Sequence, residues 1–144
     1  IMEIQVEGMK YPLYIAKDKL ELLNPVLSNP FANKNVRFIA PLDNLIWDRK
    51  LIAELFGFEY KWEVYTPINE RKYGYYVLPV LCNDRFIGRI EVETDKKAQN
   101  LIVKGFWWEK DIKPSAQCRK SIMKCLNKFA EYNRCESITL KCEI

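Results

Sequence analysis

The chain has no histidine, only five glycines, and no two cysteines spaced as Cys-x-x-Cys. Without histidine, nucleophilic catalysis of the Ser-His-Asp or Cys-His kind is excluded. No Gly-x-Gly-x-x-Gly or phosphate-binding loop is present. The five cysteines form an odd set, which argues against a zinc site or a secreted disulfide framework. Most enzyme classes and the common metal sites therefore find no support in this sequence.

Long apolar runs are also missing, since no stretch approaches the ~20 residues that a membrane-spanning helix needs. The first residues lack the pattern of a signal peptide. With 49% hydrophobic and 29% charged residues, the composition is typical of a soluble globular chain. We therefore expect a cytoplasmic protein with no membrane partner. The net charge of +4 permits binding to a polyanion but does not indicate it.

A length of 144 residues corresponds to about one domain, and the chain shows no internal repeat or low-complexity linker. We therefore treat residues 1–144 as a single domain. The chain opens at Ile1 directly with a strand-like segment. This start suggests the C-terminal fragment of a longer protein.

Hydrophobic periodicity predicts strands alternating with a few helices. A short hairpin is expected over residues 4–6 and 11–16, a helical turn over 17–23, and a loop bracketed by Asn24-Pro25 and Asn29-Pro30. Further strands are expected over 36–39, 60–66, 75–82, 85–94, 101–108 and 136–142. One helix should present Trp47, Leu51, Leu55 and Phe58 and end at Gly57, and a longer one should span 115–132. This order predicts an α+β fold, with a mostly antiparallel, curled or barrel-like sheet covered by two to three helices.

The strand over 85–94 is the most regular of the set. Asn83-Asp84 precedes it as a two-residue hairpin turn. Strict alternation would direct Phe86, Gly88, Ile90 and Val92 to the core, and Arg85, Arg89, Glu91 and Glu93 to solvent. On the neighbouring strands Trp62 and Val64, and Tyr76, Leu78 and Val80, should also face inward. Because Pro79 has no N–H to donate, we expect a sheet edge or a bulge beside it.

Adjacent cations and aromatics occur in the 67–74 connection between two of the predicted strands. Arg71 and Lys72 are suited to contact phosphates, and Tyr73 and Tyr75 to stack on a base or wedge against a groove. These four residues are the candidate DNA-binding site. The alternative is that Arg71 and Lys72 are solvated turn residues and that the tyrosines pack at the rim of the sheet.

Other charged groups have simpler interpretations. We expect Asp43, Asp48, Glu59 and Glu63 to form ordinary ion pairs, for example with Arg49 or Lys61, and not an active site. A row of Lys113, Lys120, Lys124 and Lys128 is interpreted as the solvent face of the 115–132 helix. A third basic group, Arg85, Arg89, Lys96, Lys97 and Lys104, is diluted by Glu91, Glu93 and Asp95.

Four segments in order carry a family resemblance. They are APLDNLIWDR at 40–49, LFGFEY at 55–60, VYTP at 64–67 and YGYYVLPV at 73–80. Together they resemble the C-terminal part of the winged-helix DNA glycosylases of the AlkZ/YcaQ type, and the similarity runs from about residue 4 to 109. The resemblance implies tandem winged-helix modules followed by a β-barrel, of which this chain is similar to the barrel. The implied activity is hydrolysis of the N-glycosidic bond of alkylated or crosslinked purines, without a metal or an organic cofactor.

The catalytic signature of that family, Gln-x-Gln or Gln-x-Asp, belongs to its N-terminal part. None of Gln5, Gln99 and Gln117 opens such a motif, and Gln5-Val-Glu7 is only a superficial echo. We therefore expect no catalytic residue in this chain. The resemblance implies an accessory domain whose partners are duplex DNA, bound weakly and in a salt-dependent way, and the N-terminal winged-helix domains of the same protein. The 67–74 connection resembles the family's DNA-approaching hairpin, whereas Asp43, Asn44, Trp47, Asp48 and Arg49 are expected to be architectural.

Two other functions remain open at this point. The chain could be a purely structural module that docks on the missing N-terminal domains through an exposed patch of Phe106, Trp107 and Trp108. It could also be a small-ligand barrel with a closed apolar cavity. The sequence leaves open the lesion, the oligomeric state, and whether the parent protein has Gln-x-Gln or Gln-x-Asp.

Overall fold

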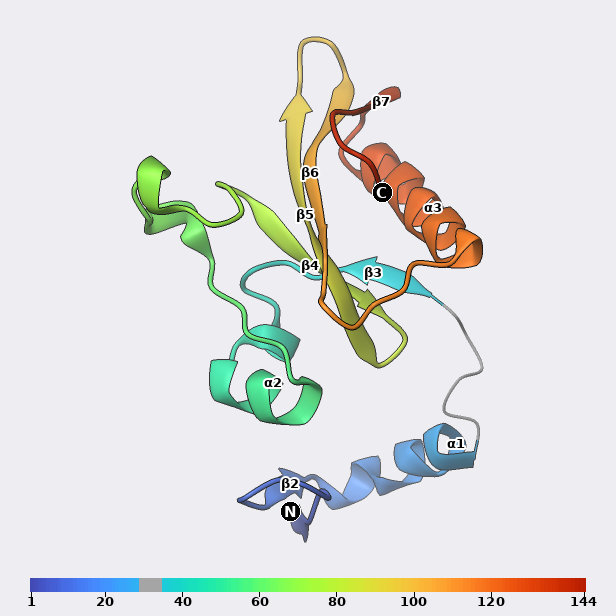
Figure 1. Cartoon of the computed structure of the whole chain (residues 1–144). Coiled ribbons are helices and arrows are strands. Elements are labelled where there is room, and N and C mark those ends of the chain that lie inside the picture. The colour runs from blue at the N-terminus through green and yellow to red at the C-terminus, as the bar shows by residue number, and fades with distance from the viewer. Residues whose placement is uncertain (29–34) are drawn as a thin grey trace.

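A computed structural model describes residues 1–28 and 35–144, and within them the chain has an α+β fold (Figure 1). A two-stranded antiparallel sheet pairs β1 with β2. A five-stranded sheet has the order β3-β4-β5-β6-β7 and curls into half a barrel. In chain order the elements are β1 (Met2–Ile4), β2 (Leu13–Ile15), α1 (Leu23–Ser28), β3 (Val36–Phe38), α2 (Arg49–Phe56), β4 (Val77–Cys82), β5 (Arg85–Asp95), β6 (Asn100–Trp108), α3 (Ala116–Tyr132) and β7 (Ser137–Leu140). The fold class expected from the sequence is therefore confirmed.

The centre of the large sheet follows the sequence pattern closely. The turn at Asn83 and Asp84 joins β4 to β5, and Asn83 adopts a left-handed φ of 57°. Strands β3 to β6 pair antiparallel, as expected, but β7 runs parallel to β6. The large sheet is therefore mostly antiparallel, as expected, with one parallel pair at its β7 edge. The reason is that α3 carries the chain back along the sheet between β6 and β7, which is the connection that parallel neighbours require.

Helix α3 covers one face of the large sheet (Figure 1). The Ser115 hydroxyl accepts a hydrogen bond from the Cys118 N–H and caps the helix. Its buried side chains, Ile122, Leu126 and Ala130, pack on the main apolar core. That core also contains Leu78, Val80, Ile87, Ile90, Val92, Leu101, Val103 and Phe106. The main apolar core of the described chain therefore lies between α3 and this face of the sheet.

A bulge in β5 changes which residues share a face. Val80 pairs with Gly88 while Leu81 pairs with Phe86, so Ile87 is the extra residue. The bulge lies close to Pro79, where a bulge or a sheet edge was expected. Because of it, Phe86 leaves the α3 side and joins a second apolar cluster with Phe58 and Tyr60. Phe86 is therefore buried, as expected, but not on the face that Ile90 and Val92 share.

The opposite face of the sheet was expected to be exposed to solvent. Instead, other parts of the chain partly cover it. Arg89 is only 7% exposed there, so its assignment to a wet strand face and to a third basic patch is wrong. Lys104, a second member of that patch, forms an ion pair of 3.2 Å with Glu93. Phe106 is buried and Trp107 and Trp108 are half-buried, so the exposed aromatic patch expected at 106–108 is also absent.

Asp43 caps the 3₁₀ helix Asn44–Ile46 that precedes α2, and Asp48 caps α2 itself. The ion pairs expected for these two aspartates are not found among the described residues. Asp43 Oδ1 accepts the Leu45 N–H, and Asp48 Oδ1 accepts the N–H groups of Lys50 and Leu51. Arg49 donates to the carbonyls of Ile46 (2.7 Å) and Pro41 (3.3 Å), and Gly57 ends the helix in a left-handed conformation. The expected apolar stripe is shifted, however. Ile46 and Ile52 are fully buried, whereas Trp47 is 70% exposed.

Residues 60–66 do not form the expected strand. They are extended and then turn through a 3₁₀ helix at Glu63–Tyr65, which a second one at Ile68–Glu70 follows. Tyr60, Glu63 and Thr66 are buried here, whereas Trp62 and Val64, which were expected to face inward, are only half-buried. The alternation of apolar and polar residues was a misleading strand signal, because a buried carboxylate looks like a solvent-facing position in the sequence.

The N-terminal segment is a hairpin followed by helical turns. A 3₁₀ helix at Lys17–Leu22 leads into α1, which runs through Asn24 and Pro25 where a loop was expected. Pro25 is tolerated because it lies in the first turn, where no N–H is needed. The second bracket of that loop, Asn29-Pro30, lies outside the described residues. None of the helices described here combines the length and the apolar character that crossing a membrane requires.

Candidate nucleic-acid interface

The loop of residues 61–76 projects from the sheet between α2 and β4 (Figure 1). Its base is fixed by one buried side chain. The Glu63 carboxylate, 7% exposed, accepts the backbone N–H groups of Lys72 (2.9 Å), Tyr73 (2.8 Å) and Gly74 (3.3 Å). Burial alone would raise the pKa of Glu63, but these N–H donors and nearby Lys61 lower it below its ordinary value. The charged carboxylate therefore holds the segment that carries the candidate residues.

A second carboxylate holds the end of this loop. Glu91 on β5 accepts the Tyr75 N–H at 2.9 Å. Gly74 lies against the same carboxylate, so that a Cβ atom at this position would collide with Glu91. Gly74 also has a φ of +152°, which L-residues with side chains rarely adopt. The backbone conformation therefore requires glycine here, and a side chain would in addition have to displace the Glu91 carboxylate.

Arg71 and Lys72 occupy different environments. Arg71 is half-buried, because its Nε donates to the Thr66 carbonyl at 2.8 Å and its guanidinium lies 5.0 Å from the Tyr75 ring centre. Lys72 is exposed, with its Nζ 5.1 Å from the Tyr73 ring centre. In the described part of the chain, neither side chain belongs to an ion pair within 4.0 Å. Lys72 is therefore the more accessible cation of the two.

Arg89 organises the surface next to Lys72. Its guanidinium lies between two aromatic rings, 4.5 Å from the centre of Phe58 and 4.6 Å from that of Tyr73. The same group donates from Nε to Glu109 at 3.0 Å and from a terminal nitrogen to the Glu59 carbonyl at 2.7 Å. Tyr73 in turn meets the Trp107 indole edge to face, with ring centres 5.4 Å apart. Arg89 thus joins the loop to the turn after α2 and to the end of β6.

These groups border an open groove of about 660 Å³, which we call the loop groove. It is lined by Phe56, Gly57, Phe58, Glu59, Lys72, Tyr73, Arg85, Phe86, Arg89, Trp107, Trp108, Glu109, Lys110 and Asp111. Glu109 is paired with Arg89. Lys72, Arg85 and Lys110 remain as exposed cations, against the carboxylates of Glu59 and Asp111. The groove therefore combines cations with aromatic faces but is not strongly positive.

Of the four predicted site residues, Lys72 and Tyr73 line the loop groove, whereas Arg71 and Tyr75 do not. Tyr75 is half-exposed and packs beside Arg71. We did not predict Arg85, Trp107 and Lys110 as neighbours of Lys72 in this groove. Their separation along the chain gave no signal, because pairing of β5 with β6 is what brings them together.

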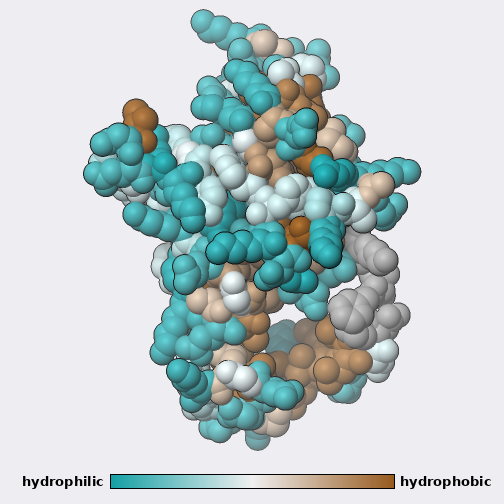
Figure 2. Space-filling view, in the orientation of Figure 1, coloured by the Kyte–Doolittle hydropathy of each residue, from teal (hydrophilic) through white to brown (hydrophobic). Residues whose placement is uncertain are grey.

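The tip of the loop carries two exposed apolar side chains. Tyr65 is 90% exposed and Ile68 is 80% exposed. Figure 2 shows a strongly hydrophobic spot at the end of this projection, which is otherwise largely polar. An apolar tip above a rigid, cation-bearing base is an arrangement that can press into the groove of a duplex.

Comparison with known proteins assigns this architecture to a family. A family model described as DNA glycosylase AlkZ-like matches residues 1–132. No solved structure matches the chain. The matched region includes the capped helix α2, the Glu63-bound loop and the loop groove. On this match over most of its length, the chain belongs to the AlkZ-like DNA glycosylase family.

Proposed function

We propose that this chain is an accessory, DNA-contacting domain of a DNA glycosylase that excises alkylated or crosslinked purines. In this proposal the 144 residues are one C-terminal domain of a longer protein, and the catalytic residues lie in winged-helix domains outside them. Family membership supports the link to DNA repair. The observation that carries DNA contact is the exposed Lys72 beside Tyr73, on a loop that a buried carboxylate holds rigid.

The role of each residue follows from its contacts. Lys72 neutralises a phosphate, because it is exposed and belongs to no ion pair in the described residues. Tyr73 is half-buried, with the cations of Lys72 and Arg89 over its ring, and its contact with Trp107 also fixes its orientation beside Lys72. Arg71 supports the loop through Thr66 and reaches phosphate only with its remaining N–H groups. Ile68 at the tip wedges against the bases or the sugars.

The experiment is a salt titration of binding to a labelled duplex, measured by fluorescence anisotropy. Loss of one phosphate contact lowers the slope of log K against log salt by about 0.9. We expect Lys72→Gln to lower the slope by that amount, and Ile68→Ser to weaken binding without changing the slope. The matched control is Lys96→Gln with Lys97→Gln, because both side chains are exposed in the turn between β5 and β6, outside the loop groove.

Two results would contradict the proposal. One is binding that is absent at low ionic strength or indifferent to salt in the unsubstituted chain. The other is a slope of log K against log salt that does not change in Lys72→Gln, or that decreases more in the Lys96→Gln, Lys97→Gln control than in Lys72→Gln. Thermal unfolding monitored by circular dichroism shows whether each variant keeps its fold.

A second candidate function is a docking module for the N-terminal domains of the same protein. The aromatic patch first expected for this role is not exposed, but Leu42 and Trp47 are, on the segment that leads into α2. These exposed apolar groups favour a covered surface. If docking is their role, Trp47→Ser weakens association with the separately expressed N-terminal half and leaves duplex binding by this chain unchanged. If the Trp47→Ser variant and the unsubstituted chain associate equally well with the N-terminal half, this candidate function is excluded.

A further inference from the structure

A second cationic groove runs between α3 and β3. Two hollows of about 510 and 440 Å³ adjoin each other, because they share Asn35, Val36, Cys125 and Lys128 in their walls, and we call them together the α3–β3 groove. Its other lining residues are Arg37, Phe38, Gln117, Lys120, Ser121, Met123, Lys124, Asn127, Phe129 and Tyr132. None of them lines the loop groove.

The charge of this groove is of one sign. Lys120, Lys124, Lys128 and Arg37 are all exposed, and no described residue that lines it is acidic. Glu131 is the single acid of α3 and lines a different hollow together with Glu136. The ion pairs found in the described chain involve Lys19, Arg89 and Lys104. These four cations are therefore available to an anionic ligand.

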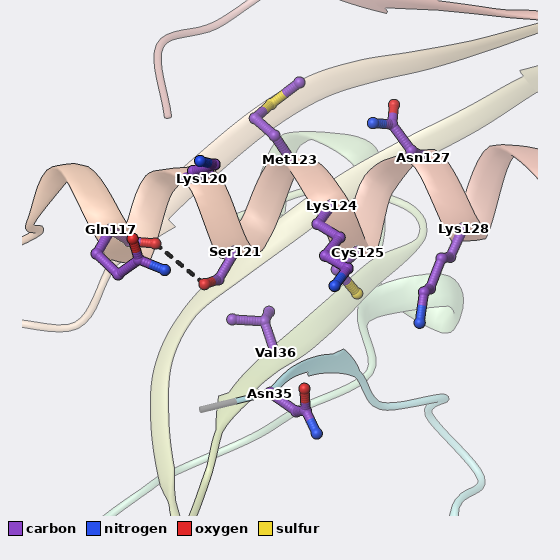
Figure 3. A pocket seen from close by; sticks show the side chains of 10 residues that line it. All are labelled: Asn35, Val36, Gln117, Lys120, Ser121, Met123, Lys124, Cys125, Asn127 and Lys128. Carbon is purple, nitrogen blue, oxygen red and sulfur yellow. Dashed lines mark hydrogen bonds between the residues drawn. The ribbon is translucent and has the colours of Figure 1, made fainter. Parts of the chain in front are cut away.

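The lysines form a row along one side of the helix. They recur every four residues, so their Cα atoms rise by roughly 6 Å per step. Like charges at this spacing repel each other on a helix surface. Figure 3 shows Lys124 and Lys128 extending toward the side where Asn35 and Val36 lie, with the Ser121 hydroxyl bonded to the Gln117 carbonyl at 3.0 Å. A linear polyanion along the groove would relieve the repulsion at every step.

An aromatic residue lies at one end of the row. Tyr132 is the last residue of α3 and is 85% exposed. The groove below it is apolar, where Phe129 meets Phe38 with ring centres 5.7 Å apart. Amide side chains of Asn35, Gln117 and Asn127 add hydrogen-bonding groups along the walls. Cations that follow a backbone, together with an aromatic face for an unpaired base, are the features by which proteins bind single strands.

We infer that the α3–β3 groove binds a single-stranded segment of nucleic acid, with its phosphates along Lys120, Lys124, Lys128 and Arg37 and one base stacked on Tyr132. The ring of Tyr132 requires an unpaired base, which separates this ligand from the duplex proposed for the loop groove. The inference does not depend on the proposed function, because the two grooves share no lining residue. It also revises the interpretation of the lysine row as a merely solvated face. Lys113, the fourth member of that row, precedes the helix.

The test measures binding of the 144-residue chain to a labelled deoxythymidine strand of about 12 nucleotides and to a duplex of equal length. The main variant carries Lys120→Gln, Lys124→Gln and Lys128→Gln. We expect it to lower the single-strand salt slope by about 2, since each phosphate contact contributes about 0.7. The control pair Lys96→Gln and Lys97→Gln removes exposed cations from another surface and should change the slope little.

Stacking is tested separately at Tyr132. Tyr132→Ala should weaken single-strand binding about fivefold or more, the range seen when one stacked base is lost. Tyr132→Phe keeps the ring and should bind as the unsubstituted chain does. Equal loss in both variants, or no loss in either, overturns stacking as the role of this residue.

The outcomes also separate this inference from the proposed function. Single-strand binding that the triple lysine variant leaves unchanged overturns the inference, whatever Lys72→Gln does to the duplex. A triple variant that weakens only duplex binding also overturns it. Conversely, an unchanged duplex slope in Lys72→Gln contradicts the proposed function and leaves the α3–β3 groove supported if the triple variant behaves as expected.

Discussion

The guanidinium of Arg89 lies over the ring of Tyr73, 4.6 Å from its centre. Arg89 comes from the middle of β5, whereas Tyr73 comes from the projecting loop, and the contact aligns the loop with the sheet. Because Arg89 is also bonded to Glu109 and to the Glu59 carbonyl, one side chain joins four separate segments. The shape of the loop groove therefore depends on a residue that itself is buried.

Replacement of Arg89 should affect both stability and the loop groove. Arg89→Lys keeps the charge but cannot form the fork of hydrogen bonds or the double ring contact. Loss of a hydrogen bond to a charged group costs about 1.5–3 kcal/mol. We expect a decrease of this size in the free energy of unfolding, measured with urea, and weaker duplex binding. Arg85→Lys, at an exposed position on the same strand, should change stability by less than about 0.5 kcal/mol.

Glu63 should make stability depend on pH in the acidic range. Its pKa is lowered in the folded chain from the ordinary value of 4.5, so the unfolded chain binds more protons in that range. The stabilisation is therefore complete above pH 4.5 and is lost as the pH falls through the folded pKa. Glu63→Gln should remove this component and lower stability at neutral pH by about 1.5–3 kcal/mol. The measurement is urea unfolding of both forms between neutral and acidic pH. Free energies of unfolding that fall in parallel for the two forms as the pH is lowered would contradict this prediction.

Gly74 should tolerate no side chain. Gly74→Ala combines an unfavourable φ of +152° with a collision against the Glu91 carboxylate. Gly57→Ala is the matched control, because its φ is +61° and a Cβ there meets no atom within 4 Å. Conformational strain alone costs about 1–2 kcal/mol. We expect Gly74→Ala to cost more than Gly57→Ala in urea unfolding; an equal or smaller cost would mean that Glu91 moves aside freely.

Tyr60 should make stability depend on pH in the alkaline range. Burial raises its pKa to about 12, although nearby Arg49 acts in the lowering direction. Its hydroxyl donates to the Val77 carbonyl at 2.8 Å. Because the folded pKa is raised, stability is complete below pH 10 and is lost as the pH rises toward about 12. Tyr60→Phe should remove this dependence and cost about 1 kcal/mol at neutral pH. Unfolding followed between pH 8 and 11 on both forms provides the comparison, and an unchanged alkaline slope would exclude Tyr60 as its source.

Local signals were sufficient for much of the fold. The turn at Asn83-Asp84, the extents of β4, β5 and β6, and the apolar stripe of α3 each depend on neighbours in sequence, so periodicity could predict them. The same holds for Asp43, Asp48 and Gly57 around α2, whose capping chemistry acts within a few residues. Lys72 and Tyr73 were found as a pair because they are adjacent in the chain.

Other features depended on distant contacts. Glu63 is buried because three backbone N–H groups from residues 72–74 surround it, and no pattern near residue 63 announces them. One extra residue at Ile87 moved Phe86 to the other face, and the loop then covered Arg89. The parallel pairing of β7 follows from the path of α3. Alternation alone therefore assigned Glu63 and Arg89 to solvent, although both are buried.

The sequence by itself determined the strands β4 to β6, the two capped helices, the family and the residues that carry charge on the loop, since all of these arise from local chemistry or from ordered motifs. The tertiary structure alone decided which of those charges share a groove. Arg89 and Trp107 meet Tyr73, and Arg37 borders one hollow together with Lys128 of α3, only after strands have paired and a helix has crossed the sheet. Burial of a charge depends on which distant donors reach it, and that depends on the path of the whole chain.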